Sequence, residues 1–190
     1  MRLPPIRIRT RLETGPLAAL YGEQEPEIFS GPGTREEPLT TVGVFEAAPQ
    51  EAPQHWHYVG FGLRDRFALE LTFRLARVPR AEGPVGPPAW PVGLLQRFAR
   101  HVVESGVGFE EGHYLCLPTP VDPGGRLRCA ALVKDPELGA SELPVYYQVV
   151  ALHERELPSM ADDGWKELIA RLRAATPLFV TRPDRAPLPA

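Results

Sequence analysis

The sequence predicts a single α+β domain in which a mostly antiparallel sheet packs against two main helices. Three observations predict it. One run of residues, 67–77, alternates apolar and polar side chains, shorter strand-like runs surround it, and two segments repeat apolar residues at helical spacing. A chain of 190 residues, 43% hydrophobic and 24% charged, has a globular composition and is long enough to bury one core.

Short elements are expected before the long strand. The first is an arm or edge strand at 1–15, followed by a helix at 16–21 and a loop at 22–38. A strand at 40–45, a second loop at 46–54 and a second strand at 55–61 come next. Thr14 is placed to cap the helix and Gly22 to end it. Arg64 and Asp65 mark a bend, so the strand at 55–61 is expected to pair antiparallel with the long strand.

The long strand at 67–77 predicts one buried face and one polar face. Its alternate side chains form two sets, Phe67, Leu69, Leu71, Phe73 and Leu75 on one face and Ala68, Glu70, Thr72, Arg74 and Ala76 on the other. The polar set predicts either a solvated sheet face or a surface beside an open edge, where a partner segment adds as a strand.

The second half of the chain predicts the two main helices and more strands. Prolines make 79–91 a loop, and the expected strands are 114–117, 128–133, 145–153 and a short one at 178–181. The run at 145–153 is apolar on both faces, which is typical of a central strand.

The first main helix follows Pro91 and ends at Gly106. Its apolar stripe is Leu95, Phe98, Ala99 and Val102. The second carries the stripe Trp165, Leu168, Ile169 and Leu172, is capped by Ser159 and Asp162, and ends at Pro177. The folded domain is therefore expected at 16–182, with a flexible tail at 183–190.

Composition excludes several functional classes. A net charge of −3 and a pI near 6.0 argue against nonspecific nucleic-acid binding. No apolar run reaches the length of a membrane span, and the N-terminus lacks the apolar stretch of a signal peptide. Phosphate loops, dinucleotide fingerprints and the serine nucleophile elbow are also missing. We expect a cytoplasmic protein with no cofactor and no nucleic-acid or membrane partner.

His55 and His57 are the best candidates for a metal site. On a strand, this spacing points both imidazoles to one face, and a third ligand could come from His113, Cys116 or His153. The pair alone is a weak motif, so structural histidines, with no metal and no catalytic residue, are the favoured interpretation. A metal-dependent enzyme built around His55 and His57 remains the alternative.

Two further groups have open interpretations. Glu110 and Glu111 beside His113 predict either an acid–base cluster or, more simply, a solvated acidic loop in a glycine-rich turn. Cys116 and Cys129 predict buried free thiols or a disulfide.

Several segments resemble the Suppressor of fused family, in order from about 20 to 185. They are His55–Asp65 (HWHYVGFGLRD), Glu70–Leu75 (ELTFRL), Pro87–Pro91 (PPAWP) with the helix after it, and shorter matches at Asp135–Pro136 and Gln148–Val150. The residues that carry the resemblance are His55, Trp56, His57, Tyr58, Phe61, Gly62, Asp65, Glu70, Thr72, Phe73, Arg74, Trp90 and Pro91.

The resemblance implies a protein-binding function. Eukaryotic Suppressor of fused is a two-domain, non-enzymatic regulator of Hedgehog signalling that clamps a peptide of Gli-type transcription factors as a strand between its domains. This chain resembles the N-terminal domain alone, as in bacterial single-domain members. In the family's partner-binding region, His101 takes the place of a tyrosine and His113 that of an aspartate, so Gli binding is not carried over.

The expected function is therefore sequestration or neutralisation of a partner protein. Single-domain relatives resemble immunity proteins that neutralise a toxin, with the motif segments as scaffold and the loops as the specific surface. The candidate partner-binding residues are His101, Glu110, Glu111 and His113. A shared acidic loop surface would complement a basic toxin, through Glu23, Glu25, Glu27, Glu36, Glu37, Glu110 and Glu111. A structural subunit of a host complex is a further alternative.

Overall fold

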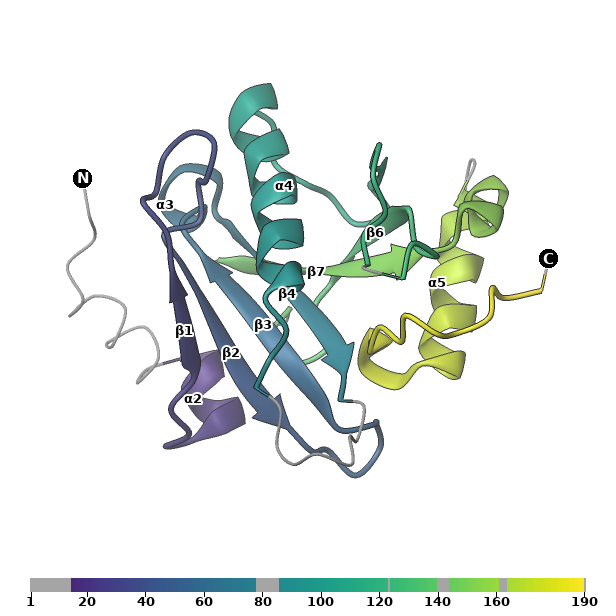
Figure 1. Cartoon of the computed structure of the whole chain (residues 1–190), viewed down its shortest axis with the longest axis horizontal. Coiled ribbons are helices and arrows are strands. Elements are labelled where there is room, and N and C mark those ends of the chain that lie inside the picture. Colours follow the sequence, from purple (N-terminus) through teal and green to yellow (C-terminus); the bar gives the residue numbers. More distant parts are fainter. Residues whose placement is uncertain (1–14, 78–85, 123, 140–143, 161–163, 190) are drawn as a thin grey trace.

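One sheet of seven strands, in the order β1-β2-β3-β4-β7-β6-β5, organises the chain (Figure 1). The computed structural model describes residues 15–77, 86–122, 124–139, 144–160 and 164–189. The strands are β1 Glu27–Ser30, β2 Thr41–Ala47, β3 His55–Phe61, β4 Leu69–Ala76, β5 Tyr114–Cys116, β6 Cys129–Lys134 and β7 Val145–Leu152. All neighbours pair antiparallel except β4 and β7, which are parallel. The mostly antiparallel sheet is confirmed.

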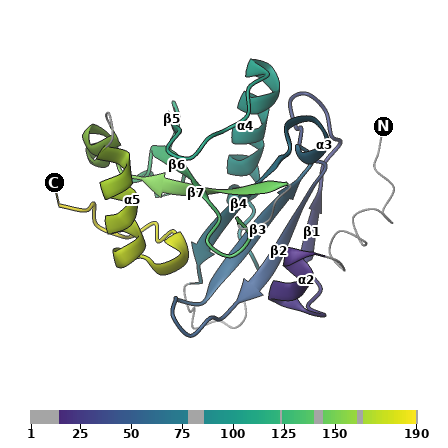
Figure 2. The ribbon, with the colours of Figure 1, turned by 180° about the vertical axis from the view of Figure 1, so that it is seen from behind.

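Helices cover both faces of this sheet, as the opposite views of Figures 1 and 2 show. They are α2 Pro16–Tyr21, α3 Arg64–Phe67, α4 Trp90–Ser105 and α5 Gly164–Ala175, with 3-10 helices η1 Glu154–Met160 and η2 Pro177–Phe179. Phe98 of α4 and Phe73 of β4 both belong to the largest apolar cluster, and Trp90 of α4 packs edge-on against Phe73. On the other face, Leu168 of α5 packs near Val150, and Leu17 of α2 lies in a third cluster. The single α+β domain with two main helices is confirmed.

The elements with strong periodicity lie where the sequence predicts them. Strand β3 has the predicted bounds, and β7 is a central strand between β4 and β6. Helix α4 has Pro91 in its first turn and buries the predicted stripe. Gly106 ends it in the left-handed conformation, with φ of 71°, and donates its N–H to the carbonyl of Val102 at 3.0 Å. Periodicity identifies these elements because their burial is one-sided or complete.

Strand β1 lies inside the segment 22–38, so the prediction of a continuous loop there was wrong. Its four residues pair with β2 from Glu27 opposite Val44 to Ser30 opposite Thr41. Phe29 is partly buried and the other three residues of β1 are exposed, so the strand lacks the apolar alternation that identifies buried strands. Backbone pairing at the sheet edge holds it instead.

The start of the long strand also differs from the prediction. Phe67 ends the short helix α3, and β4 begins only at Leu69. The reason is the Glu70 carboxylate, which accepts hydrogen bonds at 3.2 Å from the backbone N–H groups of residues 62–64. A side chain that satisfies three consecutive N–H groups stabilises a tight turn in place of a strand.

The strand predicted at 178–181 was wrong as well. The segment forms η2 and then a single parallel bridge between Thr181 and Leu75. The Gln148 side chain donates a hydrogen bond to the carbonyl of Phe179 at 3.2 Å and so ties the turn to the sheet.

Several expectations fall on residues outside the described ranges. These are the arm up to residue 14 with the Thr14 cap, the loop at 79–85 and Asp162 of the capping box. Helix α2 begins after Gly15, which offers no side-chain cap. In the segment 183–190, Arg185 forms an ion pair with Glu156 at 2.6 Å, and Leu188 packs against the α5 cluster. Among the described residues, no helix combines the length and apolar character needed to cross a membrane.

Candidate functional site

Most residues that carry the family resemblance lie inside the molecule. The buried ones are His55, His57, Tyr58, Phe61, Glu70, Thr72, Phe73, Arg74 and Pro91. Trp56, Gly62 and Trp90 are partly covered, and Asp65 is exposed. These residues therefore hold the sheet and its helices together.

The polar face predicted on the long strand is not a surface. Glu70, Thr72 and Arg74 are exposed by 1%, 0% and 0%. Strand β4 lies in the middle of the sheet, between β3 and β7, so it has no open edge for a partner segment. For Thr72 and Arg74 the prediction failed because their partners, Asp135 and Gln148, are far away in the sequence.

Arg74 is the centre of this buried polar network. One guanidinium nitrogen donates to Asp135 Oδ2 at 2.7 Å and to Gln148 Oε1 at 2.6 Å. The other donates to Asp135 Oδ1 at 3.0 Å and to Glu137 Oε2 at 2.7 Å. The Thr72 hydroxyl adds a bond to Asp135 Oδ2 at 2.6 Å. The network therefore ties β4 to β7 and to the turn after β6.

Asp135 also organises that turn. Its Oδ1 accepts hydrogen bonds from the backbone N–H groups of Glu137 and Leu138, both at 2.9 Å. Burial is the largest single influence and would raise the pKa of Asp135, but the charge of Arg74 together with the contacts from His57 and Arg74 holds this pKa well below its usual range. Burial would likewise lower the pKa of Arg74, but the charge and hydrogen bonds of Asp135, together with the charge of Glu137, raise it. The pair is therefore fully charged and compensated.

His57 joins the same network from β3. Its Nε2 lies 3.4 Å from Asp135 Oδ2, and its Nδ1 contacts the Tyr21 hydroxyl of α2. Since a carboxylate only accepts, the ring proton lies on Nε2, and Nδ1 accepts from Tyr21. Burial, and then the positive charge of Arg74, lower the pKa of His57 to about 4. His57 is therefore a neutral link between α2 and the sheet.

The geometry does not assemble the metal site considered from the sequence. His55 donates from Nδ1 to the carbonyl of Pro53 at 2.8 Å, and burial lowers its pKa to about 4. The third-ligand candidates lie elsewhere, His113 and Cys116 at β5 and His153 beside the carbonyl of Arg185. Within the described ranges, no three His, Cys, Asp or Glu residues are placed to hold a metal ion.

The four candidate partner-binding residues, in contrast, are all exposed and lie around β5. The His101 ring stacks on Phe109, with centroids 5.9 Å apart and an interplanar angle of 14°. The backbone N–H of Glu110 donates to His113 Nδ1 at 3.3 Å. We call this region the β5-edge surface, defined by His101, Val107, Glu110, Glu111, His113 and Tyr114.

Strand β5 presents an open edge with free backbone groups. Among the described residues, it is last in the sheet order and pairs with β6 alone. Leu117 donates to Arg128, and Leu132 donates to His113, so the alternate residues Tyr114 and Cys116 direct their N–H and C=O groups away from β6. Tyr114 is also 47% exposed.

The predicted shared acidic surface is not formed. Glu23, Glu25 and Glu27 lie beside β1, at one edge of the sheet, whereas Glu110 and Glu111 lie beside β5, at the other. Only the second pair belongs to the β5-edge surface.

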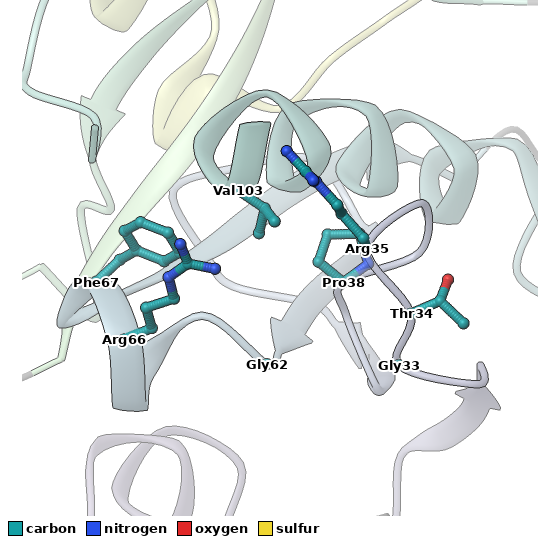
Figure 3. A pocket seen from close by; sticks show the side chains of 8 residues that line it. All are labelled: Gly33, Thr34, Arg35, Pro38, Gly62, Arg66, Phe67 and Val103. Carbon is teal, nitrogen blue, oxygen red and sulfur yellow. The ribbon is translucent and has the colours of Figure 1, made fainter. Parts of the chain in front are cut away.

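Two cavities lie away from this surface. One, of about 450 Å³, separates β1 from α4. The other encloses about 470 Å³, and Figure 3 shows Arg35 and Arg66 reaching toward Val103 from its two sides. Arg66 packs over the Phe67 ring at 5.0 Å, and in the described part of the chain neither arginine forms an ion pair. This basic, partly apolar hollow is suited to small anionic groups.

Sequence reasoning missed two kinds of residue. Tyr21 and Glu137 were not identified as members of the network, and only the polar Gln148 inside an apolar strand could have signalled it. At the surface, it missed the exposed apolar side chains of Val107 and Tyr114, at 64% and 47%. No pattern in the sequence shows that these two side chains remain uncovered.

Comparisons with known proteins support the family resemblance found in the sequence. The model of the Suppressor of fused protein family matches residues 36–186. The human Suppressor of fused homologue is 29% identical over a 162-residue alignment that covers 72% of this chain and 33% of the human protein. The chain thus spans about a third of the length of that relative.

Solved structures share the fold. A crystal structure of the Sufu–Fu complex contains a chain that matches with a TM-score of 0.81 and 23% identity, over 94% of this chain and 90% of that one. A Suppressor of fused homologue from Neisseria gonorrhoeae matches with a TM-score of 0.68 and 15% identity, over 90% of this chain and 92% of that one.

Proposed function

Because the chain belongs to the Suppressor of fused family, we propose that it is a non-catalytic protein-binding module that sequesters or neutralises a partner through its β5-edge surface. The partner contributes an extended segment, which pairs with β5 as an additional strand. This mode uses backbone hydrogen bonds for affinity and side-chain contacts for specificity.

The observation that carries the proposal is the open, partly apolar edge at β5. Val107 and Tyr114 are two of the three exposed large hydrophobic side chains among the described residues, and both lie in the segment that leads from the end of α4 into β5. The outward backbone groups of Tyr114 and Cys116 give an added strand its hydrogen-bond partners. Apolar contacts beside an unpaired strand edge favour protein binding over simple solvation.

Charge at the same surface favours a basic partner segment. Glu110 and Glu111 are exposed at the start of β5 and attract positive charge during encounter. His101 lies flat on Phe109 and presents an aromatic face to the partner. These features support a partner strand flanked by lysine or arginine.

Toxin neutralisation in a bacterial cytoplasm is the specific role that we favour. The resemblance to single-domain family members supports it, and so does the acidic pair, because a toxin that acts on nucleic acid carries a basic surface. On this proposal the bound chain blocks the toxin sterically, and inhibition of the toxin requires no catalysis by the chain.

A metal-dependent enzyme is the less supported candidate. His55 and His57 are fully buried, and both have lowered pKa values with partners inside the fold. The side chains that reach solvent around β5 form no nucleophile–base pair among the described residues. A structural subunit of a larger complex would use the same surface, but it would bind abundant host proteins.

Affinity capture from the organism that encodes the chain tests the proposal. We expect the wild-type protein to retain one partner at equal stoichiometry, and the His101→Ala/Tyr114→Ala variant to lose it. Ile28→Ala is the matched control, because Ile28 is 45% exposed on the opposite sheet edge. Cell fractionation in the same host tests the cytoplasmic location.

The opposite pattern would overturn the proposed surface. If the partner stays with the His101→Ala/Tyr114→Ala variant and is lost with Ile28→Ala, the β1 edge is the binding site. If captures from several growth conditions contain no partner, protein binding itself is contradicted.

A further inference from the structure

Cys116 and Cys129 face each other across the edge pair of strands. They are direct partners in the antiparallel register of β5 and β6, and both are free thiols. Cys116 is exposed, whereas Cys129 is only 1% exposed and belongs to the apolar cluster under α5. One thiol is therefore accessible from solvent, and the other lies directly behind it.

The backbone pattern places the two side chains close together. In the same ladder, Leu117 donates to Arg128 at 2.9 Å, and Leu132 donates to His113 at 2.8 Å. These bonded pairs alternate with pairs that exchange no backbone bonds, and Cys116 with Cys129 is one of the latter. Non-bonded pairs have the shorter Cα separation, of about 4.5 Å, which lies within the range that a disulfide spans.

The thiols already interact in the reduced protein. Burial raises the pKa of Cys129 to about 12, and a hydrogen bond and electrostatic repulsion from Cys116 add to this rise. Cys129 is therefore protonated at neutral pH, and the exposed Cys116 is the thiol that an oxidant meets first.

We propose that Cys116 and Cys129 form a reversible oxidative modification site, in which a small-molecule disulfide converts the pair into a cross-strand disulfide. The Cys116 thiolate attacks one sulfur of the oxidant, and one small thiolate leaves. The Cys129 thiol then gives up its proton and attacks the Cys116 sulfur, and the second small thiol leaves. Two electrons pass from the protein to the oxidant, whose disulfide is reduced to two thiols.

The Cys116–Cys129 disulfide fixes the edge strand β5 to its neighbour β6. The new bond joins β5 to β6 at Cys116, whose outward backbone groups belong to the docking edge. Oxidation therefore restricts local opening of β5 and pre-orders the edge that receives a partner strand. This consequence for docking rests on the proposed function, whereas disulfide formation requires no partner.

Treatment of the purified, reduced protein with oxidised glutathione tests the site. We expect the wild-type chain to lose two hydrogens in intact mass, to lose both titratable thiols, and to yield a joined Cys116–Cys129 peptide that reductant separates. The Cys129→Ser variant keeps a thiol at Cys116 but has no resolving thiol, so it should retain one glutathione. The Cys116→Ser variant should react at least tenfold more slowly.

Two further measurements separate an intramolecular bond from other products. The midpoint of thermal unfolding should rise by roughly 5–10 °C on oxidation. The Leu117 amide should exchange with solvent at least tenfold more slowly. A wild-type chain that stays reduced, retains glutathione or forms a disulfide-linked dimer would overturn the proposal. Failure of the proposed function would appear separately, as loss of partner capture with disulfide formation intact.

Discussion

The buried centre of the sheet and its β5 edge use the same residue types in opposite ways. At the centre, Arg74, Asp135 and His57 are buried, Arg74 donates to Asp135, and His57 Nε2 lies 3.4 Å from the same carboxylate. At the edge, His101 and Glu110 are exposed; the His101 ring stacks on Phe109, and the backbone N–H of Glu110 donates to His113. A histidine or carboxylate in the first setting fixes the fold, whereas in the second it is available to a partner. The family motif therefore marks framework, and function is expected at residues outside it.

Removal of Arg74 should give the largest effect on stability. Arg74→Met leaves Asp135 and Glu137 without their shared cation, and an uncompensated buried charge costs about 3–5 kcal/mol of unfolding free energy. Urea denaturation followed by circular dichroism measures this loss. Arg126→Met is the matched control, since Arg126 is exposed in a loop, and it should change stability by less than about 0.5 kcal/mol. Equal losses in the two variants would contradict the distinction between centre and surface.

The buried histidines should make stability depend on pH. The pKa of His57 is about 4 in the folded chain and about 6.5 when unfolded, so below pH 6.5 the unfolded state binds the additional proton. Stability is therefore complete above pH 6.5 and falls as the pH drops toward 4. From pH 7 to 5 the loss due to His57 is on the order of 2 kcal/mol.

Urea unfolding at several pH values tests this dependence. His55 should contribute in the same direction, because its pKa is also lowered to about 4. His57→Gln should flatten the profile below pH 6.5. A wild-type stability that stays constant or rises between pH 7 and 5 would show that these histidines are not buried in neutral form.

The turn at residues 62–64 should show a smaller effect. Glu70→Gln removes the charge that accepts three backbone N–H groups but keeps one acceptor oxygen, so we expect a loss of about 1–2 kcal/mol. The exchange rates of those three amides, measured by NMR, should rise together. An unchanged rate at all three would show that Glu70 does not hold the turn.

Substitutions at the β5-edge surface should leave stability almost unchanged. Tyr114→Ala removes an exposed side chain, so its unfolding free energy should stay within about 0.5 kcal/mol of the wild type. The affinity for a captured partner, measured by calorimetry, should fall at least tenfold. A large loss of stability with affinity preserved would mean that Tyr114 belongs to the framework.

The sequence predicts those parts of the fold that depend on interactions between residues close together in the chain. Strand β3 and helix α4 are predicted because their residues repeat a local apolar pattern. Strand β1 is missed because it is held mainly by backbone pairing, and a single partly buried residue, Phe29, gives no apolar alternation. Thr72 and Arg74 are assigned to a surface because their partner, Asp135, is more than sixty residues away, and local periodicity does not report on such contacts.

The candidate site shows the same limit. His101 and His113 were identified through the resemblance, and Glu110 and Glu111 through the acidic loop. Phe109, on which His101 stacks, and the turn before β5 connect these residues. Tyr114 and Val107 were not identified, because exposure of an apolar side chain is decided by the whole packing arrangement. The separation of the acidic residues to opposite edges follows from strand order, which the sequence alone does not give.

Amide hydrogen exchange on the complex with the captured partner tests the central claim most directly. The N–H groups of Tyr114 and Cys116 point away from β6, and no other strand in the described part of the chain pairs with β5 on that side. If the partner adds a strand at this edge, both amides should exchange at least tenfold more slowly in the complex, while the amides of β1 remain unchanged. Unchanged exchange at Tyr114 and Cys116, with protection at β1 or around the Arg35–Arg66 cavity, would contradict binding at the β5 edge.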